Sequence, residues 1–480
     1  MADLTKDEAA HMLRRAGFGG SSDEIEDLMS RGREGAVDYL INYAQIDDRA
    51  MDDLLKASFD FSNPLEFSRF NRGELERWWF TRMVFTRRQF QEKMTLFWHN
   101  HFATAGSKVD DIFMYVQNLT LRDHALDGFD TLLLKVAQDP AMLIWLDGIT
   151  SVKGNPNENF ARELQELFTM GIADVVTGEP NYTEQDVKEI ARAFTGWKFF
   201  HPRLDPDPFS FAFFENPNEH DNQTKTVYGK PANYDGKDII DVISARPATA
   251  RYLTWKLFNF FVYPLTATSA DRSTIDKFAS VYLSKNHSIK ELVRAIFTSE
   301  EFFSSRARFA LVKSPAELIV GSIRMLGARY NPGTSGDQEG ANILAAFSII
   351  LGQELFNPPD VAGWNLNLGW INTSTLLNRF TYADLLAINR TRDLNSPGLW
   401  LAHERLKSFT KKTAKKTVKK LLSALGPLDV GSETTRTLKN YLETDDQGNG
   451  IDFTADDQAI DKKVRGLVHL IMCLSEFQLN

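Results

Sequence analysis

Histidines and acidic residues that could carry chemistry lie in three short segments of this 480-residue chain. The first segment holds His99 and His101, the second holds His124, and the third holds His220 next to Asp221. Imidazole nitrogens and carboxylate oxygens are ligands for divalent metals, and the same groups act as general acids and bases. The sequence therefore indicates a metal site built from His99, His101, His220 and Asp221, or an acid–base pair, if the fold brings these segments together.

A helix bearing carboxylates is predicted between Asn155 and Gly171. At about 100° per residue, its polar residues fall within an arc of about 140°, and these are Glu158, Asn159, Arg162, Glu163 and Glu166. Its apolar residues occupy about 100° on the opposite side, and these are Phe160, Leu164, Leu167 and Phe168. The residues from Asn155 to Asn157 suit a helix cap, and Gly171 suits a left-handed end. The polar face is either a solvated surface with Glu–Arg pairs four residues apart or the wall of a pocket.

The spacing of the first two histidines limits what they can do together. On a regular helix His99 and His101 point about 200° away from each other. Either the helix ends near Trp98, or one histidine packs structurally while the other acts. The letters H-N-H alone do not indicate an HNH nuclease, whose fold needs strands and a further metal-binding histidine. The chain also has no G-x-S-x-G, no phosphate-binding P-loop motif and no G-x-G-x-x-G that opens a helix.

Two functions remain open. The first is a hydrolase with a pocket lined by His and Glu, in which a divalent metal activates water. A version without metal uses Glu158 or Glu163 as the general base and Arg162 to bind an anionic group, with His124 as a further candidate for catalysis. The second is a non-catalytic helical scaffold whose acidic groove and aromatic loops hold a saccharide or a protein. We prefer the enzyme slightly, with an unknown small molecule or a saccharide as the ligand.

The elements that must position these residues are mostly helices. Capping-box spacings at Thr5 with Glu8, at Ser21 with Glu24 and at Ser314 with Glu317 mark helix starts. Apolar residues between Leu75 and Trp98 predict one largely buried helix or a pair of helices. The helical period fails between about 198 and 240, where we expect a β-hairpin around Phe209 to Phe214 and Lys225 to Tyr228. We predict a mainly α-helical domain over residues 1–395 with this partly β insertion, and a helical C-terminal subdomain over 396–480 that packs on it.

Charge and composition restrict the partners. The formal net charge of −9 argues against general nucleic-acid binding. The hydrophobic fraction of 43% is enough for a substantial core. The lysine pairs from Lys411 to Lys420 predict a basic helix face, which we interpret as surface charge. The single cysteine, Cys473, excludes an intrachain disulfide. The first residues show no signal-peptide pattern and no long apolar run follows, so we expect a cytoplasmic protein without a membrane span, or an exported, periplasmic one if the N-terminus was trimmed.

Several longer motifs carry a family resemblance. They are D-E-A-A-H-M-L-R-R-A-G-F-G from Asp7, Q-E-K-M-T-L-F-W-H-N-H-F-A-T from Gln91, D-P-A-M-L from Asp139, N-P-N-E-N-F-A-R-E-L from Asn155, Y-T-E-Q-D-V and A-F-T-G-W between Tyr182 and Trp197, P-A-T-A-R from Pro247, and P-P-D-V-A-G-W with W-I-N-T between Pro358 and Thr373. Together they resemble a bacterial family known as domain of unknown function 1800. The resemblance implies a fold and a site location better than a reaction. By analogy with relatives that look exported, it also implies a sulfatase-like partner protein.

Overall fold

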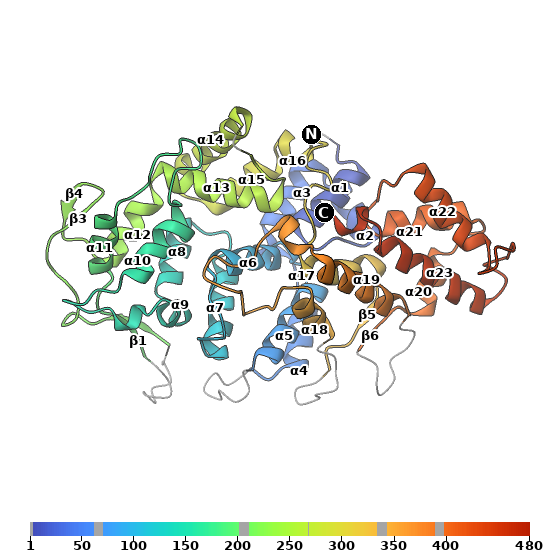
Figure 1. The fold of residues 1–480 in the computed structure, drawn as a ribbon, viewed down its shortest axis with the longest axis horizontal. Coiled ribbons are helices and arrows are strands. Elements are labelled where there is room, and N and C mark those ends of the chain that lie inside the picture. Colours follow the sequence, from blue (N-terminus) through green and yellow to red (C-terminus); the bar gives the residue numbers. More distant parts are fainter. Residues whose placement is uncertain (1–2, 62–70, 201–210, 267, 334–342, 389–397) are drawn as a thin grey trace.

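The computed structural model describes residues 3–61, 71–200, 211–266, 268–333, 343–388 and 398–480. These residues form 23 α-helices and three small antiparallel sheets of two strands each (Figure 1). The prediction of a mainly α-helical fold with a small β-containing insertion is confirmed. No helix in the described ranges is both long enough and apolar enough to cross a bilayer.

The first half of the chain contains α1 to α11. Their bounds are α1 Lys6–Ala16, α2 Ser22–Ser30, α3 Gly32–Ile41, α4 Arg49–Ser58, α5 Arg72–Phe85, α6 Gln89–His101, α7 Asp111–Asp123, α8 Phe129–Ala137, α9 Pro140–Trp145, α10 Glu158–Glu163 and α11 Glu184–Ala193. A π-helix, η4 (Leu164–Thr169), continues α10 without a break. The predicted helix of the Asn155 to Gly171 stretch is therefore present, but its second half has the wider π form. Asn157 caps it, and Gly171 has the predicted left-handed backbone with φ of +77°.

The second half contains α12 to α23. Their bounds are α12 Gly236–Ser244, α13 Pro247–Phe261, α14 Ser269–Ser284, α15 Ile289–Phe297, α16 Glu300–Phe303, α17 Pro315–Leu326, α18 Ile343–Ile350, α19 Thr373–Ile388, α20 His403–Phe409, α21 Ala414–Ala424, α22 Ser432–Glu443 and α23 Asp457–Met472. Three capping boxes lie where the sequence places them, at the starts of α1, α2 and α17. Each cap satisfies backbone N–H groups that have no partner inside the helix, which stabilises the helix by about 1 kcal/mol.

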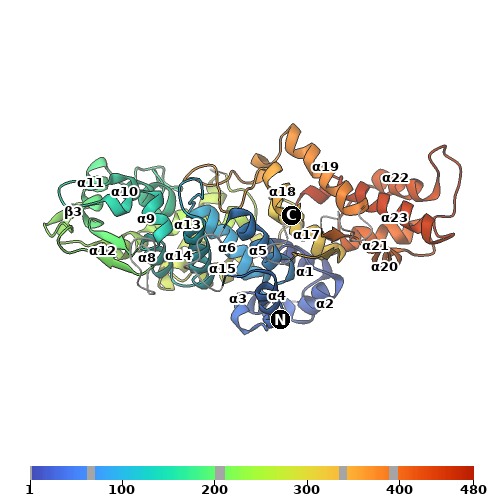
Figure 2. The ribbon, with the colours of Figure 1, turned by 90° about the horizontal axis from the view of Figure 1, so that it is seen from below.

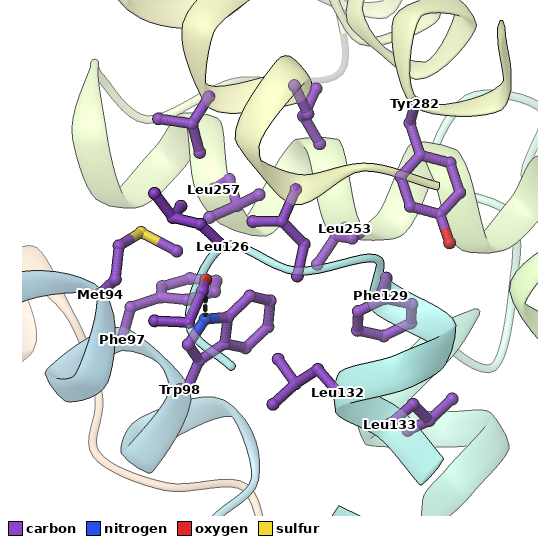
Figure 3. Packing of buried hydrophobic residues seen from close by; sticks show 14 of the residues in the cluster. Met94, Phe97, Trp98, Leu126, Phe129, Leu132, Leu133, Leu253, Leu257 and Tyr282 are labelled. Atoms are coloured by element: carbon purple, nitrogen blue, oxygen red, sulfur yellow. Dashed lines mark hydrogen bonds between the residues drawn. The ribbon is translucent and has the colours of Figure 1, made fainter. Parts of the chain in front are cut away.

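The segment from Leu75 to Trp98 forms a pair of helices, α5 and α6, that connects two hydrophobic cores. Met94, Phe97 and Trp98 of α6 belong to one core, together with residues of α8 and α13, whereas Leu96 of α6 belongs to a second core with α5, α17 and α19. Figure 3 shows the first core, in which the Trp98 indole N–H donates to the Ala125 carbonyl at 2.9 Å. This bond satisfies the polar atom of a fully buried ring.

The insertion contains two separate hairpins. β1 (Trp197–Phe199) pairs with β2 (Phe213–Glu215), and β3 (Lys225–Val227) pairs with β4 (Lys230–Ala232). The expected pairing of Phe209 to Phe214 with Lys225 to Tyr228 was therefore wrong, and residues 201–210 lie outside the described residues. The β3–β4 turn consists of Tyr228 and Gly229, both with positive φ, as a two-residue hairpin requires. A turn this short closes at little entropic cost, which favours the local pairing.

The C-terminal end of the chain lies near the middle of the molecule, where it contacts Leu311. Both ribbon views show α10 and α11 at one end, α20 to α23 at the opposite end, and α5 and α6 between them (Figures 1 and 2). β5 (Arg329–Tyr330) pairs with β6 (Leu399–Trp400), and the Asn480 N–H donates to the Leu311 carbonyl. Residues of the C-terminal helices share the second core with α5 and α17. The C-terminal segment is thus packed on the preceding part of the chain.

Candidate functional site

The helix that carries the H-N-H segment continues through both histidines. α6 ends at His101, and both rings are buried. His99 accepts a hydrogen bond from the Phe356 N–H at its Nε2, at 3.1 Å, and it lies against the rings of Trp79 and Trp364. Burial lowers the pKa of His99 to about 3, so its imidazole is neutral at physiological pH. His99 thereby anchors the segment around Phe356.

His101 faces a different neighbour. Its Nε2 lies 2.9 Å from the Phe168 carbonyl, which can only accept, so this nitrogen carries the proton. The ring stacks on Phe97 with 12° between the planes. Burial, with the positive charge of Lys256 nearby, lowers the pKa of His101 to about 3. The segment from Trp98 to Phe102 therefore contacts the π-helix η4 through His101, while His99 contacts another part of the chain.

The other two candidate histidines, His124 and His220, each contact a different part of the chain. His124, which caps the C-terminus of α7, is partly exposed, and its Nδ1 lies 2.7 Å from an Asp127 oxygen. The Nδ1 of His220 lies 2.9 Å from the Thr195 carbonyl. Asp221 accepts from the Arg192 Nε at 2.8 Å, which lowers the pKa of Asp221. Within the described ranges, no three or more His, Cys, Asp or Glu side chains are grouped so that they could hold a metal ion.

The polar face of α10 is an ion-pair network. Arg162 forms two hydrogen bonds of 2.8 Å to the carboxylate of Glu184, and it lies 3.6 Å from oxygens of both Glu158 and Glu166. Hydrogen bonds to Glu184 raise the pKa of Arg162. Since three carboxylates of the chain already surround this guanidinium, the protein itself neutralises its positive charge. An anionic substrate would have to displace one of them.

Glu163 differs from its neighbours on this helix. It is half-buried and is not among the hydrogen bonds or ion pairs of the described residues. Burial raises its pKa, and the neighbouring Glu166 raises it further. Glu166 accepts a hydrogen bond from the Tyr182 hydroxyl. Glu163 is therefore the one acidic side chain of the predicted polar face that is free to exchange a proton, and none of the three candidate histidine segments donates to it in this structure.

A buried acidic residue that the sequence analysis missed lies on α5. The Glu76 side chain is only 3% exposed, and its Oε1 has no hydrogen-bond partner among the described residues. Burial, together with the charges of Glu354 and Asp111, raises the pKa of Glu76 to about 8, although Arg72 opposes the shift. Glu76 is therefore mostly protonated at neutral pH.

Three charged residues that act electrostatically on Glu76 are more exposed to solvent than Glu76 itself. Arg72 lies 3.3 Å from a Glu354 oxygen and 3.5 Å from an Asp111 oxygen. Their side chains are 24%, 33% and 22% exposed, respectively. One guanidinium thus serves two carboxylates, and it offsets the upward shift of the Glu76 pKa only in part. We call Arg72, Glu76, Asp111 and Glu354 the carboxyl cluster; it has a buried end at Glu76 and a solvent end at Glu354.

His99 of the H-N-H segment and residues just outside two of the family-like motifs hold the cluster together. The Asn357 side chain donates to Glu354 at 2.9 Å, and the adjacent Phe356, which has a positive φ of 61°, is fixed by His99 and by a bond from the Gly106 N–H to its carbonyl. A Cβ at Gly106 would lie 2.2 Å from Arg72 Nη2, so glycine makes room for the guanidinium. His99 therefore positions the turn that carries Glu354.

A second contact joins the same motifs. The Asn100 side chain accepts from the Trp364 N–H at 2.6 Å. Gly363, at φ of +81°, lies so close that a Cβ would be 2.3 Å from the Asn100 oxygen. The H-N-H segment and the P-P-D-V-A-G-W segment, more than 250 residues apart, thus form one junction beside the carboxyl cluster.

One signal in the sequence could have revealed Glu76. At helical spacing, Glu76 is followed three, four and seven residues later by Trp79, Phe80 and Met83, all of them fully buried. A carboxylate on the apolar stripe of a helix has to be buried, and it is either paired or kept neutral. The other two acidic residues of the cluster, Asp111 and Glu354, could not be inferred, because they come from distant parts of the chain.

Comparison with known proteins gives one match. No curated protein and no solved structure matches the chain. A family model described as "Protein of unknown function (DUF1800)" matches residues 11–479, which is nearly the whole chain. The chain therefore belongs to the DUF1800 family.

Proposed function

We propose that this protein is a hydrolase that works with carboxyl groups, and that the carboxyl cluster at Arg72, Glu76, Asp111 and Glu354 is its catalytic centre. The observation that carries the proposal is Glu76, a buried carboxyl group with an unpartnered oxygen and a pKa of about 8, beside a carboxylate that Arg72 pairs. Two acidic groups whose environments hold one protonated and the other ionised are the pair that acid–base hydrolysis needs.

The chemistry assigns one role to each group. Glu76 holds the proton that goes to the leaving-group oxygen as its bond to carbon breaks. The Glu354 carboxylate takes a proton from the water that attacks the same carbon. The proton then returns to Glu76, so that the reaction consumes one water and the cluster is unchanged. Arg72 orients Glu354 through their ion pair at 3.3 Å.

The charge of the cluster favours a neutral substrate. With Glu76 protonated, two carboxylates and one guanidinium leave a net charge of about −1, which repels phosphate and sulfate esters. A hydroxyl-rich neutral molecule fits better, and paired carboxyl groups are the usual catalysts of glycoside hydrolysis. A saccharide is therefore the substrate class that we propose. A metal-assisted route would need a ligand set that the described residues do not assemble.

The proposal has a test that needs no known substrate. In the infrared spectrum, the wild-type protein at pH 7 should show a protonated-carboxyl C=O band that disappears in Glu76→Gln. A panel of p-nitrophenyl glycosides, esters, phosphates and sulfates is then assayed for nitrophenolate release. We expect release from glycosides, reduced at least 100-fold in Glu76→Gln and in Glu354→Gln and unchanged in Glu34→Gln, an exposed residue of α3. Absence of the infrared band, or wild-type rates in both cluster variants, would contradict the proposal.

A further inference from the structure

A second site lies at the opposite side of the cores from the α10 helix, where the N-terminal helix meets the C-terminal helices. There a cavity of about 800 Å³ opens between α1, the turn at Arg308 and Phe309, α21, and the turn after it. This volume lies within the range of pockets for small ligands, about 300 to 1,000 Å³. The figures show α10 and α21 at opposite ends of the molecule, so this cavity is separate from the α10 face (Figures 1 and 2).

The cavity is strongly basic although the protein is acidic. Five of its lining residues are cationic, and these are Lys6, Arg14, Arg308, Lys415 and Lys419. Only two are acidic, Asp7 and Asp429, which gives a formal net charge of +3 in a chain whose net charge is −9. No ion pair of the described residues involves Lys6, Arg308, Lys415 or Lys419. This excess of positive charge attracts an anion.

Arg14 forms the buried end of the cavity. Its side chain is 4% exposed, it donates to the Gly426 carbonyl at 2.7 Å, and its Nε has no hydrogen-bond partner among the described residues. The guanidinium lies 4.5 Å from the centre of the Phe309 ring. The backbone of Phe309 has a positive φ of 52°. Burial and the nearby Arg308 lower the pKa of Arg14 to about 10, so it stays charged at neutral pH. A buried cation with a free N–H has an unmet need for an anionic acceptor.

The rest of the wall is apolar. Phe309, Val418, Leu422, Leu428 and Val430 line it beside the cations. A small inorganic anion would leave this apolar surface exposed to water, whereas an alkyl or aryl group would cover it and gain the free energy of burial. We propose that the cavity binds an anionic amphiphile, a carboxylate or phosphate headgroup at Arg14 with an apolar tail against α21. The lysine run of α21, interpreted from sequence as surface charge, thereby contributes one side of a binding site.

Binding is tested by titrating the full-length protein with decanoate and decyl phosphate and recording the heat of binding. Two control ligands are titrated in the same way: decanol, which has the same tail without a charge, and inorganic phosphate, which is the headgroup without a tail. We expect decyl phosphate to bind, octyl phosphate to bind about tenfold more weakly because two methylenes fewer are buried, and decanol and phosphate to bind far more weakly. Added salt should weaken the binding of the charged ligands.

α21 offers a matched pair of variants. Lys415→Glu/Lys419→Glu reverses two charges that line the cavity, and Lys416→Glu/Lys420→Glu makes the same change, at the same spacing, on exposed residues of the same helix that do not line it. The first variant should weaken decyl phosphate binding at least tenfold and the second less than threefold. Equal losses in both variants, equal binding of decanol, or no binding of decyl phosphate would overturn the proposal.

The source of the headgroup is resolved by vesicles. Co-sedimentation with phosphatidylglycerol vesicles but not with phosphatidylcholine vesicles, lost in Lys415→Glu/Lys419→Glu, would identify a lipid headgroup as the ligand. Binding of monomeric decyl phosphate without co-sedimentation would identify a free amphiphile. Both outcomes support the cavity as an anionic-amphiphile site. If the cavity does not bind these ligands, the proposed function of the carboxyl cluster is not affected, because the two sites share no residue.

Discussion

Replacing Glu76 by Gln should stabilise the protein, which is unusual for a change in a buried core. The pKa of Glu76 is about 8 in the folded protein against an ordinary value of 4.5. A raised acid pKa means that stability is fully present below the ordinary value and is lost as the pH rises toward the folded value. Each pH unit in this window costs about 1.4 kcal/mol. At pH 7 the wild type is therefore about 3 kcal/mol less stable than a variant whose side chain is neutral at every pH.

Thermal unfolding measures this difference. Unfolding entropy near 2.1 cal/mol/K per residue gives about 1 kcal/mol/K for a chain of this length, so about 3 kcal/mol corresponds to a Tm about 3 °C higher for Glu76→Gln. The gap should grow from roughly 2 kcal/mol at pH 6 to roughly 4 kcal/mol at pH 8. A variant that is less stable than the wild type at pH 7, or a gap that does not change with pH, would refute the reasoning.

Glu92 on α6 is the control for Glu76. It is completely buried, but it accepts from the Arg122 Nε at 2.9 Å, from the Arg82 Nε at 3.0 Å and from the Trp79 indole N–H at 2.9 Å. These arginines overcome the effect of burial and hold the pKa of Glu92 down at about 2. Glu92→Gln leaves buried guanidinium groups without their counter-charge and should cost about 3–5 kcal/mol at pH 7. Replacing Glu by Gln should therefore raise the stability of the protein at position 76 and lower it at position 92, on two adjacent helices.

Three further outcomes are expected. Burial lowers the pKa of His101 to about 3, so the stability that this residue contributes is present above its ordinary pKa of 6.5 and is lost as the pH falls. Between pH 7 and pH 5, the free energy of unfolding of the wild type should therefore fall by about 2 kcal/mol more than that of His101→Gln, as measured in denaturant titrations. Glu317→Gln removes the ion-pair partner of Lys93, which is buried, and should cost about 3–5 kcal/mol in the same titrations. Gly363→Ala should lower the Tm by several degrees, because the new Cβ meets Asn100 at 2.3 Å and the backbone has φ of +81°.

Local features of the fold could be predicted because their causes are local. Thr5, Ser21 and Ser314 each meet a glutamate three residues later, and all three capping boxes form. The helix predicted between Asn155 and Gly171 is capped at its start by Asn157, whose side chain accepts from the Asn159 N–H, and Gly171 after its end takes the positive φ that glycine tolerates. What could not be predicted is the change to a π-helix at Leu164, because its position depends on packing against other helices.

The candidate site shows where sequence reasoning reaches its limit. The spacing of His99 and His101 correctly implied that the two side chains diverge, and the structure shows which group each ring meets, Phe356 or Phe168. Those partners lie 257 and 67 residues away, and no local pattern encodes them. Arg162 was expected to face a ligand, but Glu184 occupies its guanidinium from the next helix. The roles of such residues depend on contacts that only the fold creates.

The contrast between Glu76 and Glu92 bears on function as well as stability. The fold neutralises Glu92 with Arg82 and Arg122, so a fully buried carboxylate on these helices can be satisfied. At Glu76 it instead places one guanidinium, Arg72, between two other acidic residues and leaves the buried oxygen without a partner. A glutamine or a leucine at position 76 would avoid this cost. A protein that retains a carboxyl group where it lowers stability has the strained arrangement typical of catalytic sites, and for that reason the first search for activity belongs at Glu76 and not on the α10 face.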